Sequence, residues 1–201
     1  KDPLKCTECP SGYYQTNSDV KECTPCSVGK YNTAGGATSC ANCDAGKYAA
    51  NDGSTTCAAC DAGSFTNTGA KVGATTCASC AAGKYSNTSK VDACSSCPAG
   101  KYAASAGSSA CTKCKAGRYQ EANGQSFCDP CDPGMYQELS ASTACARCSK
   151  GKYVAATASD RADKCSACRA GTYQDELGQS ACKECSKGKY GSADETKRDA
   201  E

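Results

Sequence analysis

The amino-acid sequence predicts small disulfide-rich repeats: short β-hairpin modules in tandem, stacked as an elongated rod, with almost no helix and no global hydrophobic core. Cysteine supplies 22 of the 201 residues, a share of about 11% that indicates a disulfide scaffold or a metal array. The chain has three Leu, five Val, two Phe and no Ile, together about 5%, far below the roughly 20% expected for a chain with a packed core. A short motif also repeats along almost the whole chain, and repeats that contact only their neighbours stack in one dimension.

The repeat begins with a CxxC pair and recurs every 17 residues, except for two steps of 20 residues that start at Cys57 and Cys145. We divide the chain into an N-terminal lead, residues 1–5, and eleven tandem repeats. The repeats span residues 6–22, 23–39, 40–56, 57–76, 77–93, 94–110, 111–127, 128–144, 145–164, 165–181 and 182–201.

Each repeat continues as C-x-x-C-x-x-G-x-(Tyr/Phe). The glycine, Gly12 in the first repeat, tolerates an unusual backbone turn. We expect a short strand that carries the aromatic residue, then a tight turn, then a second short strand that returns to the next cysteine. A second glycine five residues after the aromatic, within an Asp-Gly or Asn-Gly pair in two repeats, favours this hairpin. One ring over the cystine is expected to form the whole core of each repeat, and these rings are Tyr14, Tyr31, Tyr48, Phe65, Tyr85, Tyr102, Tyr119, Tyr136, Tyr153, Tyr173 and Tyr190.

The paired cysteines raise three alternatives: zinc sites, redox sites and structural disulfides. Zinc is disfavoured because no repeat places Gly directly after its second cysteine, as zinc knuckles commonly do, and because eleven pairs cannot be divided evenly into four-cysteine sites. A redox CxxC works from a helix N-terminus, and no segment here has helical periodicity. We therefore expect structural disulfides, with no metal, no cofactor and no catalytic residue.

Sequence alone does not fix the pairing of the cysteines. In a uniform scheme, the second cysteine of one repeat joins the first cysteine of the next, and each bond contributes about 3 kcal/mol by closing one loop. A bond within each CxxC would close a loop too small to organise a repeat, and a crossed pattern over two repeats would leave one repeat over. The uniform scheme gives Cys9–Cys23, Cys26–Cys40, Cys43–Cys57, Cys60–Cys77, Cys80–Cys94, Cys97–Cys111, Cys114–Cys128, Cys131–Cys145, Cys148–Cys165 and Cys168–Cys182.

The uniform scheme leaves Cys6 and Cys185 without partners. We expect each to pair with another chain or with a segment that lies upstream or downstream of this one. Lys1 is not an initiator residue and the start shows no signal peptide, so the chain is expected to be a processed product or a fragment. Cys185 of one copy is predicted to lie near a cysteine of a neighbouring segment, such as Cys6 of the next copy.

The run C-x-x-G-x-Tyr, followed by a cysteine fourteen positions after the first, resembles the first, one-disulfide module of tumour-necrosis-factor-receptor cysteine-rich domains. The tandem form, as in CSSCPAGKY from Cys94 to Tyr102, is similar to the ephrin-receptor-like cysteine-rich repeats of animal, protist and algal surface proteins. This resemblance covers residues 6 to about 190 and implies the uniform pairing, exposure outside the cell and an elongated shape. Receptor domains alternate this module with a crossed two-disulfide module, and this chain does not, which argues against cytokine-type binding.

The uniformity of the repeats favours a structural function, since no repeat has a distinctive aromatic residue, acid or insertion. We predict an extracellular or cell-surface protein, a cystine-stapled rod that forms part of a filament, flagellar hair, coat or stalk through self-association or contact with other surface proteins. The alternative is a ligand-binding receptor or adhesin ectodomain, or a surface antigen. An enzyme is not expected, because the chain has no His and no recognisable nucleophile–base pair. A net charge of +2 with interspersed signs indicates no nucleic-acid partner, and no apolar run approaches the ~18 residues of a membrane helix.

Two features of the expected surface indicate functions other than that of a scaffold. Asn87, in Asn87-Thr88-Ser89, is an N-glycosylation acceptor by its motif. A ladder of cations lies between the glycine and the aromatic, on the strand face opposite the ring; it would either bind an anionic glycan or serve solubility and protect strand edges. The ladder consists of Lys30, Lys47, Lys84, Lys101, Arg118, Lys152 and Lys189.

Overall fold

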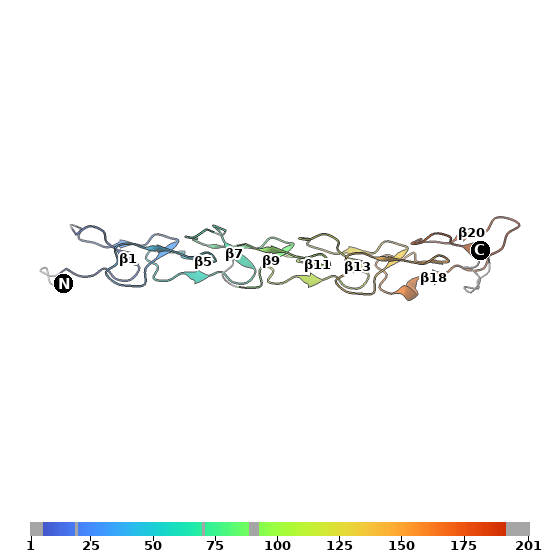
Figure 1. Cartoon of the computed structure of the whole chain (residues 1–201), viewed down its shortest axis with the longest axis horizontal. Coiled ribbons are helices and arrows are strands. Elements are labelled where there is room, and N and C mark those ends of the chain that lie inside the picture. Colours follow the sequence, from blue (N-terminus) through green and yellow to red (C-terminus); the bar gives the residue numbers. More distant parts are fainter. Residues whose placement is uncertain (1–5, 19, 70, 89–92, 192–201) are drawn as a thin grey trace. The chain divides into compact units, whose positions relative to one another are not determined.

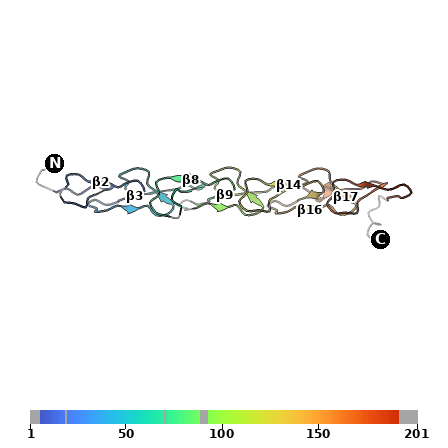
Figure 2. The same cartoon turned by 90° about the horizontal axis from the view of Figure 1, so that it is seen from above.

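The computed structural model describes residues 6–18, 20–69, 71–88 and 93–191. Within these ranges the chain forms twenty strands of two or three residues and one short 3-10 turn, η1 (Ala162–Lys164), joined by loops (Figures 1 and 2). The strands pair as ten antiparallel hairpins. The hairpins are β1 (Tyr13–Tyr14) with β2 (Thr24–Pro25), β3 (Lys30–Tyr31) with β4 (Ala41–Asn42), β5 (Lys47–Tyr48) with β6 (Ala58–Ala59), β7 (Ser64–Thr66) with β8 (Cys77–Ser79), β9 (Lys84–Tyr85) with β10 (Ser95–Ser96), β11 (Lys101–Tyr102) with β12 (Thr112–Lys113), β13 (Arg118–Tyr119) with β14 (Asp129–Pro130), β15 (Met135–Tyr136) with β16 (Ala146–Arg147), β17 (Lys152–Tyr153) with β18 (Ser166–Ala167) and β19 (Thr172–Tyr173) with β20 (Lys183–Glu184).

A reverse turn leads into the first strand of each hairpin. In the second repeat the N–H of Lys30 donates to the carbonyl of Ser27 at 3.0 Å, and Gly29 between them has a φ of 80°. A positive φ at this point is typical of a type II turn, and glycine adopts it without steric cost. The equivalent hydrogen bond recurs in all eleven repeats, so this glycine sets the start of each hairpin.

The second strand of each hairpin lies between the two cysteines of the next CxxC pair. Tyr31 in β3 lies opposite Ala41 in β4, and Ala41 follows Cys40. The expected turn is present after the aromatic, at Gly35 and Gly36, but the second strand starts only at or after the next cysteine rather than ending there. The connecting segment is an open loop, because its backbone bonds to neighbouring repeats: the N–H of Asn32 donates to the carbonyl of Ser54 at 3.2 Å.

Ten disulfides close the hairpins, each between the second cysteine of one repeat and the first cysteine of the next. Their Cα atoms are 5.7 or 5.8 Å apart. Eight of the bonds join cysteines 14 residues apart, whereas Cys60–Cys77 and Cys148–Cys165 span 17 residues. The additional residues of the two long repeats therefore lie inside the loop that the disulfide closes.

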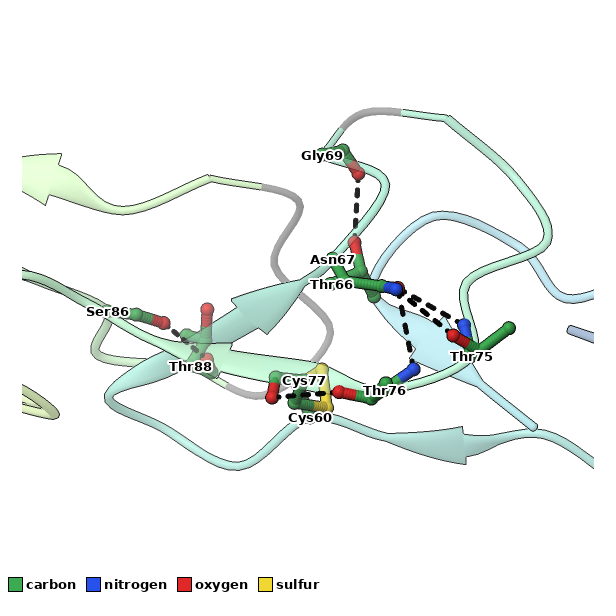
Figure 3. The surroundings of a disulfide bond; sticks show 9 residues. All are labelled: Cys60, Thr66, Asn67, Gly69, Thr75, Thr76, Cys77, Ser86 and Thr88. Atoms are coloured by element: carbon green, nitrogen blue, oxygen red, sulfur yellow. Dashed lines mark hydrogen bonds between the residues drawn. A yellow bond between two sulfur atoms is a disulfide. The ribbon is translucent and has the colours of Figure 1, made fainter. Parts of the chain in front are cut away.

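The first long repeat shows how an enlarged loop is stabilised (Figure 3). The Oδ1 atom of Asn67 accepts a hydrogen bond from the N–H of Thr75 at 3.1 Å, and its Nδ2 donates to Thr75 Oγ1 at 3.0 Å. The hydroxyl of Thr66 donates to the carbonyl of Gly69 at 2.8 Å. The loop thus satisfies its polar groups locally, beside the Cys60–Cys77 bond.

The buried core of the described residues consists mainly of half-cystines and, in seven repeats, the residue that follows the aromatic, together with Ala74 and Ser159. The second cysteine of each pair from Cys26 to Cys168 is at most 1% exposed. The prediction that the ring is the whole core of a repeat was wrong: no repeat aromatic is buried, Tyr190 is 91% exposed, and Tyr136 is only partly buried where it packs against Cys148 and Cys165. Successive residues of a strand point to opposite faces. The residue after the aromatic therefore points toward the neighbouring repeats, and the ring lies on the opposite face of the strand. That residue is buried in seven repeats, as Ala49, Thr66, Ser86, Ala103, Gln120, Val154 and Gln174.

The chain divides into two compact units. The first comprises Lys1–Ser95 and Ser105–Ala110, and the second comprises Ser96–Ala104 and Cys111–Glu201. The same disulfide-closed hairpin recurs within each unit. In the described ranges, no helix has the length and apolar composition that crossing a bilayer requires.

Candidate functional site: the contact between successive repeats

In six repeats of the described chain, the glycine of the turn packs against the backbone of the repeat two positions further along. A Cβ atom on Gly12 would overlap the carbonyl oxygen of Gly53, and its carbonyl carbon would lie 2.9 Å away. Since Gly12 also has a φ of 84°, both the backbone conformation and the close approach require glycine. The same contact recurs for Gly29 with Gly73, Gly63 with Gly107, Gly100 with Ala141, Gly117 with Ala158 and Gly134 with Gly178.

Backbone hydrogen bonds extend this contact over three successive repeats. The N–H of Cys26 donates to the carbonyl of Gly12 in the preceding repeat at 2.8 Å, and the carbonyl of Cys26 accepts from the N–H of Gly53 in the following repeat at 2.7 Å. The polar backbone of this fully buried half-cystine is therefore satisfied on both sides. Equivalent pairs of bonds hold Cys43, Cys80, Cys114, Cys131 and Cys148.

The buried residue after the aromatic forms a second bridge between repeats. The carbonyl of Ala49 accepts from the N–H of Gly29 in the preceding repeat at 2.9 Å, and its N–H donates to the carbonyl of Ala74 in the following repeat at 3.1 Å. Each repeat thus contacts its neighbours through the same main-chain atoms. Such an arrangement depends little on side-chain identity, which explains how diverse loop sequences fit one geometry.

Four repeats place glutamine at this bridging position, and its side chain fixes the loop. In the seventh repeat Gln120 Oε1 accepts from the N–H of Ala122 at 3.0 Å, and Nε2 donates to the carbonyl of Phe127 at 3.1 Å. The residues with the same pair of bonds are Gln15, Gln120, Gln137 and Gln174. Sequence analysis missed this position, although one signal was present: none of the eleven repeats places a charged residue directly after the aromatic.

The contact is open at the last two repeats in the described part of the chain. Gly171 and Gly188 have positive φ values like their counterparts, yet a Cβ on either would meet no atom within 4 Å. Cys185 is half-buried and Cys6 is exposed, and neither forms a disulfide. Toward the start of the chain, the three atoms nearest to a Cβ on Gly36 are side-chain atoms of Glu8, and side-chain atoms are also the nearest neighbours at the equivalent Gly107 and Gly124.

The predicted ladder of cations occupies the first position of the strands. Lys30, Lys47, Lys84, Lys101, Arg118 and Lys152 begin β3, β5, β9, β11, β13 and β17. Lys189 and Tyr190 lie outside any strand. Lys47 is paired with Asp44, Nζ to Oδ2, at 3.4 Å, and Arg118 donates from Nη1 to the carbonyl of Cys128 at 3.0 Å. The members of the ladder therefore differ in their surroundings.

A charged cluster near the last hairpin joins the tenth repeat to the eleventh. Lys183 in β20 places Nζ 2.8 Å from Asp175 Oδ1 and 3.1 Å from Glu176 Oε1. The hydrogen bond from Lys183 lowers the pKa of Asp175 below its usual range, and the two carboxylates raise the pKa of Lys183. All three groups are exposed to solvent, so this cluster positions the loop rather than forming a reactive site.

The remaining candidate residues do not gather into a chemical site. No group of three or more His, Cys, Asp or Glu side chains with the arrangement of a metal site occurs in the described segments. Asn87 is exposed in the loop after β9, where the hydroxyl of Ser86 donates to the carbonyl of Thr88 at 2.9 Å (Figure 3). Ser89, the third residue of the glycosylation motif, lies outside the described residues.

Comparison with known families agrees with this architecture. The profile of the family described as tyrosine-protein kinase ephrin type A/B receptor-like matches residues 3–43, 29–75, 68–110, 100–148 and 156–201. These matches tile the chain and confirm the resemblance seen in the sequence. The matched family is a cysteine-rich receptor-like repeat and not an enzyme family. No curated protein matches the chain.

Proposed function

Since the chain belongs to the ephrin type A/B receptor-like family of cysteine-rich repeats, we propose that it is an extracellular structural protein whose repeats assemble end to end with further copies of the chain. The observation that carries the proposal is the periodic contact, in which six of the described repeats use the same main-chain atoms and one glycine to meet the next two repeats. A surface of this kind accepts any further repeat of the same design. Assembly into a filament, hair, coat or stalk would arise from repetition of that contact.

The open positions at the two ends are complementary. Gly188 of one copy lacks the backbone partner that earlier glycines have, and in the internal register the glycine that would pack on Gly36 belongs to a repeat upstream of the first. In the register of the internal repeats, Gly188 would pack on Gly36 of a second copy, and Cys185 would lie beside Cys6 of that copy. Oxidation of the two thiols to one disulfide releases two protons and two electrons, which oxidised glutathione accepts as it is reduced to two thiols.

Sedimentation velocity of the chain in a glutathione redox buffer tests the proposal, together with non-reducing electrophoresis. We expect a series of disulfide-linked oligomers for the wild-type chain, at most dimers for Cys6→Ser or Cys185→Ser, and no linked species for the double variant. Both cysteines lie outside the ten internal disulfides, so the variants leave each hairpin closed. Gly188→Ala adds bulk at the open face, besides straining a backbone with a φ of 85°, and should also reduce oligomers under reducing conditions that spare the internal bonds; Gly171→Ala, which strains the backbone in the same way, is the comparison for that strain.

The second candidate is a ligand-binding ectodomain or adhesin, which the receptor-like character of the family supports. It predicts a chain that stays monomeric at all concentrations and whose sedimentation does not change with Cys6→Ser or Cys185→Ser. That result would contradict end-to-end assembly. Pairing of Cys6 or Cys185 with a cysteine in some other segment would instead give a mixed disulfide in peptide mapping of the natural protein.

A further inference from the structure

Two shallow grooves of the same design lie on the first unit. Groove I, between the first and second repeats, is lined by Tyr14, Ser27, Lys30, Ser39 and Cys40, with further hydroxyl-bearing residues at its edge, and has a volume of about 350 Å³. In both grooves an aromatic ring of one repeat lines the space together with a cation and a hydroxyl of the next repeat and a half-cystine of the repeat after that.

Groove II occurs one repeat further along and is smaller. It is lined by Tyr31, Asp44, Lys47, Thr56 and Cys57, with a volume of about 210 Å³. Each of these residues occupies the same place in its repeat as a residue of groove I. The grooves therefore arise from the repeat itself, and their differences come from single substitutions.

The lining of groove I has the chemistry of a carbohydrate site. A tyrosine ring offers a flat apolar face with a polar tip, serine hydroxyls both donate and accept hydrogen bonds, and an ammonium group binds a carboxylate or sulfate. Ligand sites for whole small molecules span roughly 300–1,000 Å³. The grooves, of about 210 and 350 Å³, lie below or near the lower limit of that range, which suits one unit of a polymer held along several repeats. Grooves that recur at regular intervals along a protein also suit a polymer whose chemical units repeat at regular intervals.

One substitution makes the two grooves differ in charge. In groove II, Asp44 holds the ammonium group of Lys47 at 3.4 Å and brings its own negative charge into the groove. In groove I the equivalent residue is Ser27, and Lys30 has no ion-pair partner within the described segments. Groove I therefore presents a free cation where groove II presents a neutral pair.

We propose that groove I binds an acidic sugar unit of a polysaccharide, with the ring of Tyr14 against the sugar face and the ammonium group of Lys30 on its carboxylate or sulfate. The hydroxyl groups of Ser27 and Ser39 supply hydrogen bonds to the hydroxyl groups of the sugar. Groove II has equivalent residues but rejects the acidic group, because Asp44 forms an ion pair with Lys47. This site stands independently of end-to-end assembly.

Isothermal titration of the oxidised chain with three probes tests the site: oligogalacturonate, a size-matched dextran sulfate and neutral dextran. We expect binding of an acidic probe that weakens as salt rises and no binding of neutral dextran. Lys30→Gln and Ser27→Asp should each weaken binding about five-fold, the second by placing an acid beside Lys30 as in groove II. Asp44→Ser should strengthen binding, because it frees Lys47 and gives the chain a second site.

The control is Lys71→Gln, which makes the same change of charge at an exposed lysine outside both grooves and should leave the affinity unchanged. If Lys71→Gln weakens binding as much as Lys30→Gln, only diffuse charge attraction is present and the site is disproved. Failure of both acidic probes to bind, or an Asp44→Ser variant that binds no better than wild type, would also overturn the proposal. The stronger of the two acidic probes shows whether carboxylate or sulfate is the preferred group.

Discussion

Gly117 lies against the backbone carbonyl of Ala158, the residue at the turn of the repeat two positions further along the chain. The N–H of Gly117 donates to the carbonyl of Gln137 in the repeat between them at 2.7 Å, and the N–H of Ala158 donates to the carbonyl of Cys131 there at 2.8 Å. Three repeats therefore meet around one glycine. The stability of this repeat therefore depends on contacts with the next two repeats, whereas in a simple stack a repeat would contact only the next one.

The first prediction separates the two demands on this glycine. Gly117→Ala incurs both a positive φ and an overlap with the carbonyl of Ala158, whereas Gly171→Ala incurs only the φ, because nothing lies within 4 Å of its Cβ position. We expect a loss of about 1 kcal/mol at Gly171 and about 1–3 kcal/mol more at Gly117. Hydrogen exchange of the oxidised chain around each site measures both losses, and equal effects would show that the contact adds nothing.

The second prediction concerns a residue under backbone strain. Ala141 has a φ of 61° at a position where Gly53, Gly107 and Gly124 have similar positive values. An L-residue with a side chain is unfavourable in this left-handed region. Ala141→Gly should therefore raise the stability of the eighth repeat by about 1 kcal/mol, measured as a higher thermal midpoint. Ala146→Gly, at a strand position in the same hairpin, should lower it.

The third prediction tests the glutamine bridge. Gln120 is 4% exposed, and removing its side chain leaves the N–H of Ala122 and the carbonyl of Phe127 without their partners. Gln120→Ala should cost about 1–3 kcal/mol, seen as faster hydrogen exchange in the loop that follows Tyr119. Gln125→Ala is the control, because Gln125 contacts the neighbouring repeat through its backbone carbonyl, which the substitution retains. A similar loss in the two variants would contradict the role of the Gln120 side chain.

The fourth prediction concerns acid. The pKa of Asp175 is lower in the folded chain than its ordinary value of 3.8, chiefly through the hydrogen bond from Lys183. A group with a depressed folded pKa stabilises the fold above its unfolded pKa and loses that contribution as the pH falls through the folded value. NMR titration should therefore place the midpoint of Asp175 below 3.8, and Lys183→Gln should bring it back toward 3.8. An unchanged midpoint in the variant would show that the pair does not persist in solution.

The fifth prediction concerns the cystines. Loss of one native disulfide from a small module costs about 2–5 kcal/mol, and the described hairpins have little buried surface besides half-cystines. A thiol reductant should therefore abolish the slow hydrogen exchange of the chain, whereas a metal chelator without reductant should leave it unchanged. Unfolding by the chelator alone would indicate metal at the cysteines.

The sequence by itself determined the fold class, disulfide-rich hairpin modules, because this class depends on local patterns of residues. The spacing of the CxxC pairs, the scarcity of aliphatic residues and the glycine before each aromatic predicted disulfide-rich hairpin modules of the ephrin-receptor-like type. Each of those signals acts within one repeat, through the turn at Gly29 or the loop that a disulfide closes. For that reason they could be interpreted without a structure.

Only the tertiary structure decided which atoms face the neighbouring repeats. It started the second strand after Cys40, where the sequence had indicated only a strand that returns to that cysteine, and it buried Ala49 rather than the ring of Tyr48. The contact of Gly12 with Gly53 joins residues of the first and third repeats, and no local pattern encodes a partner at that distance. Main-chain hydrogen bonds carry this packing, and every residue except proline offers the same main-chain groups, so the sequence could not show where they meet.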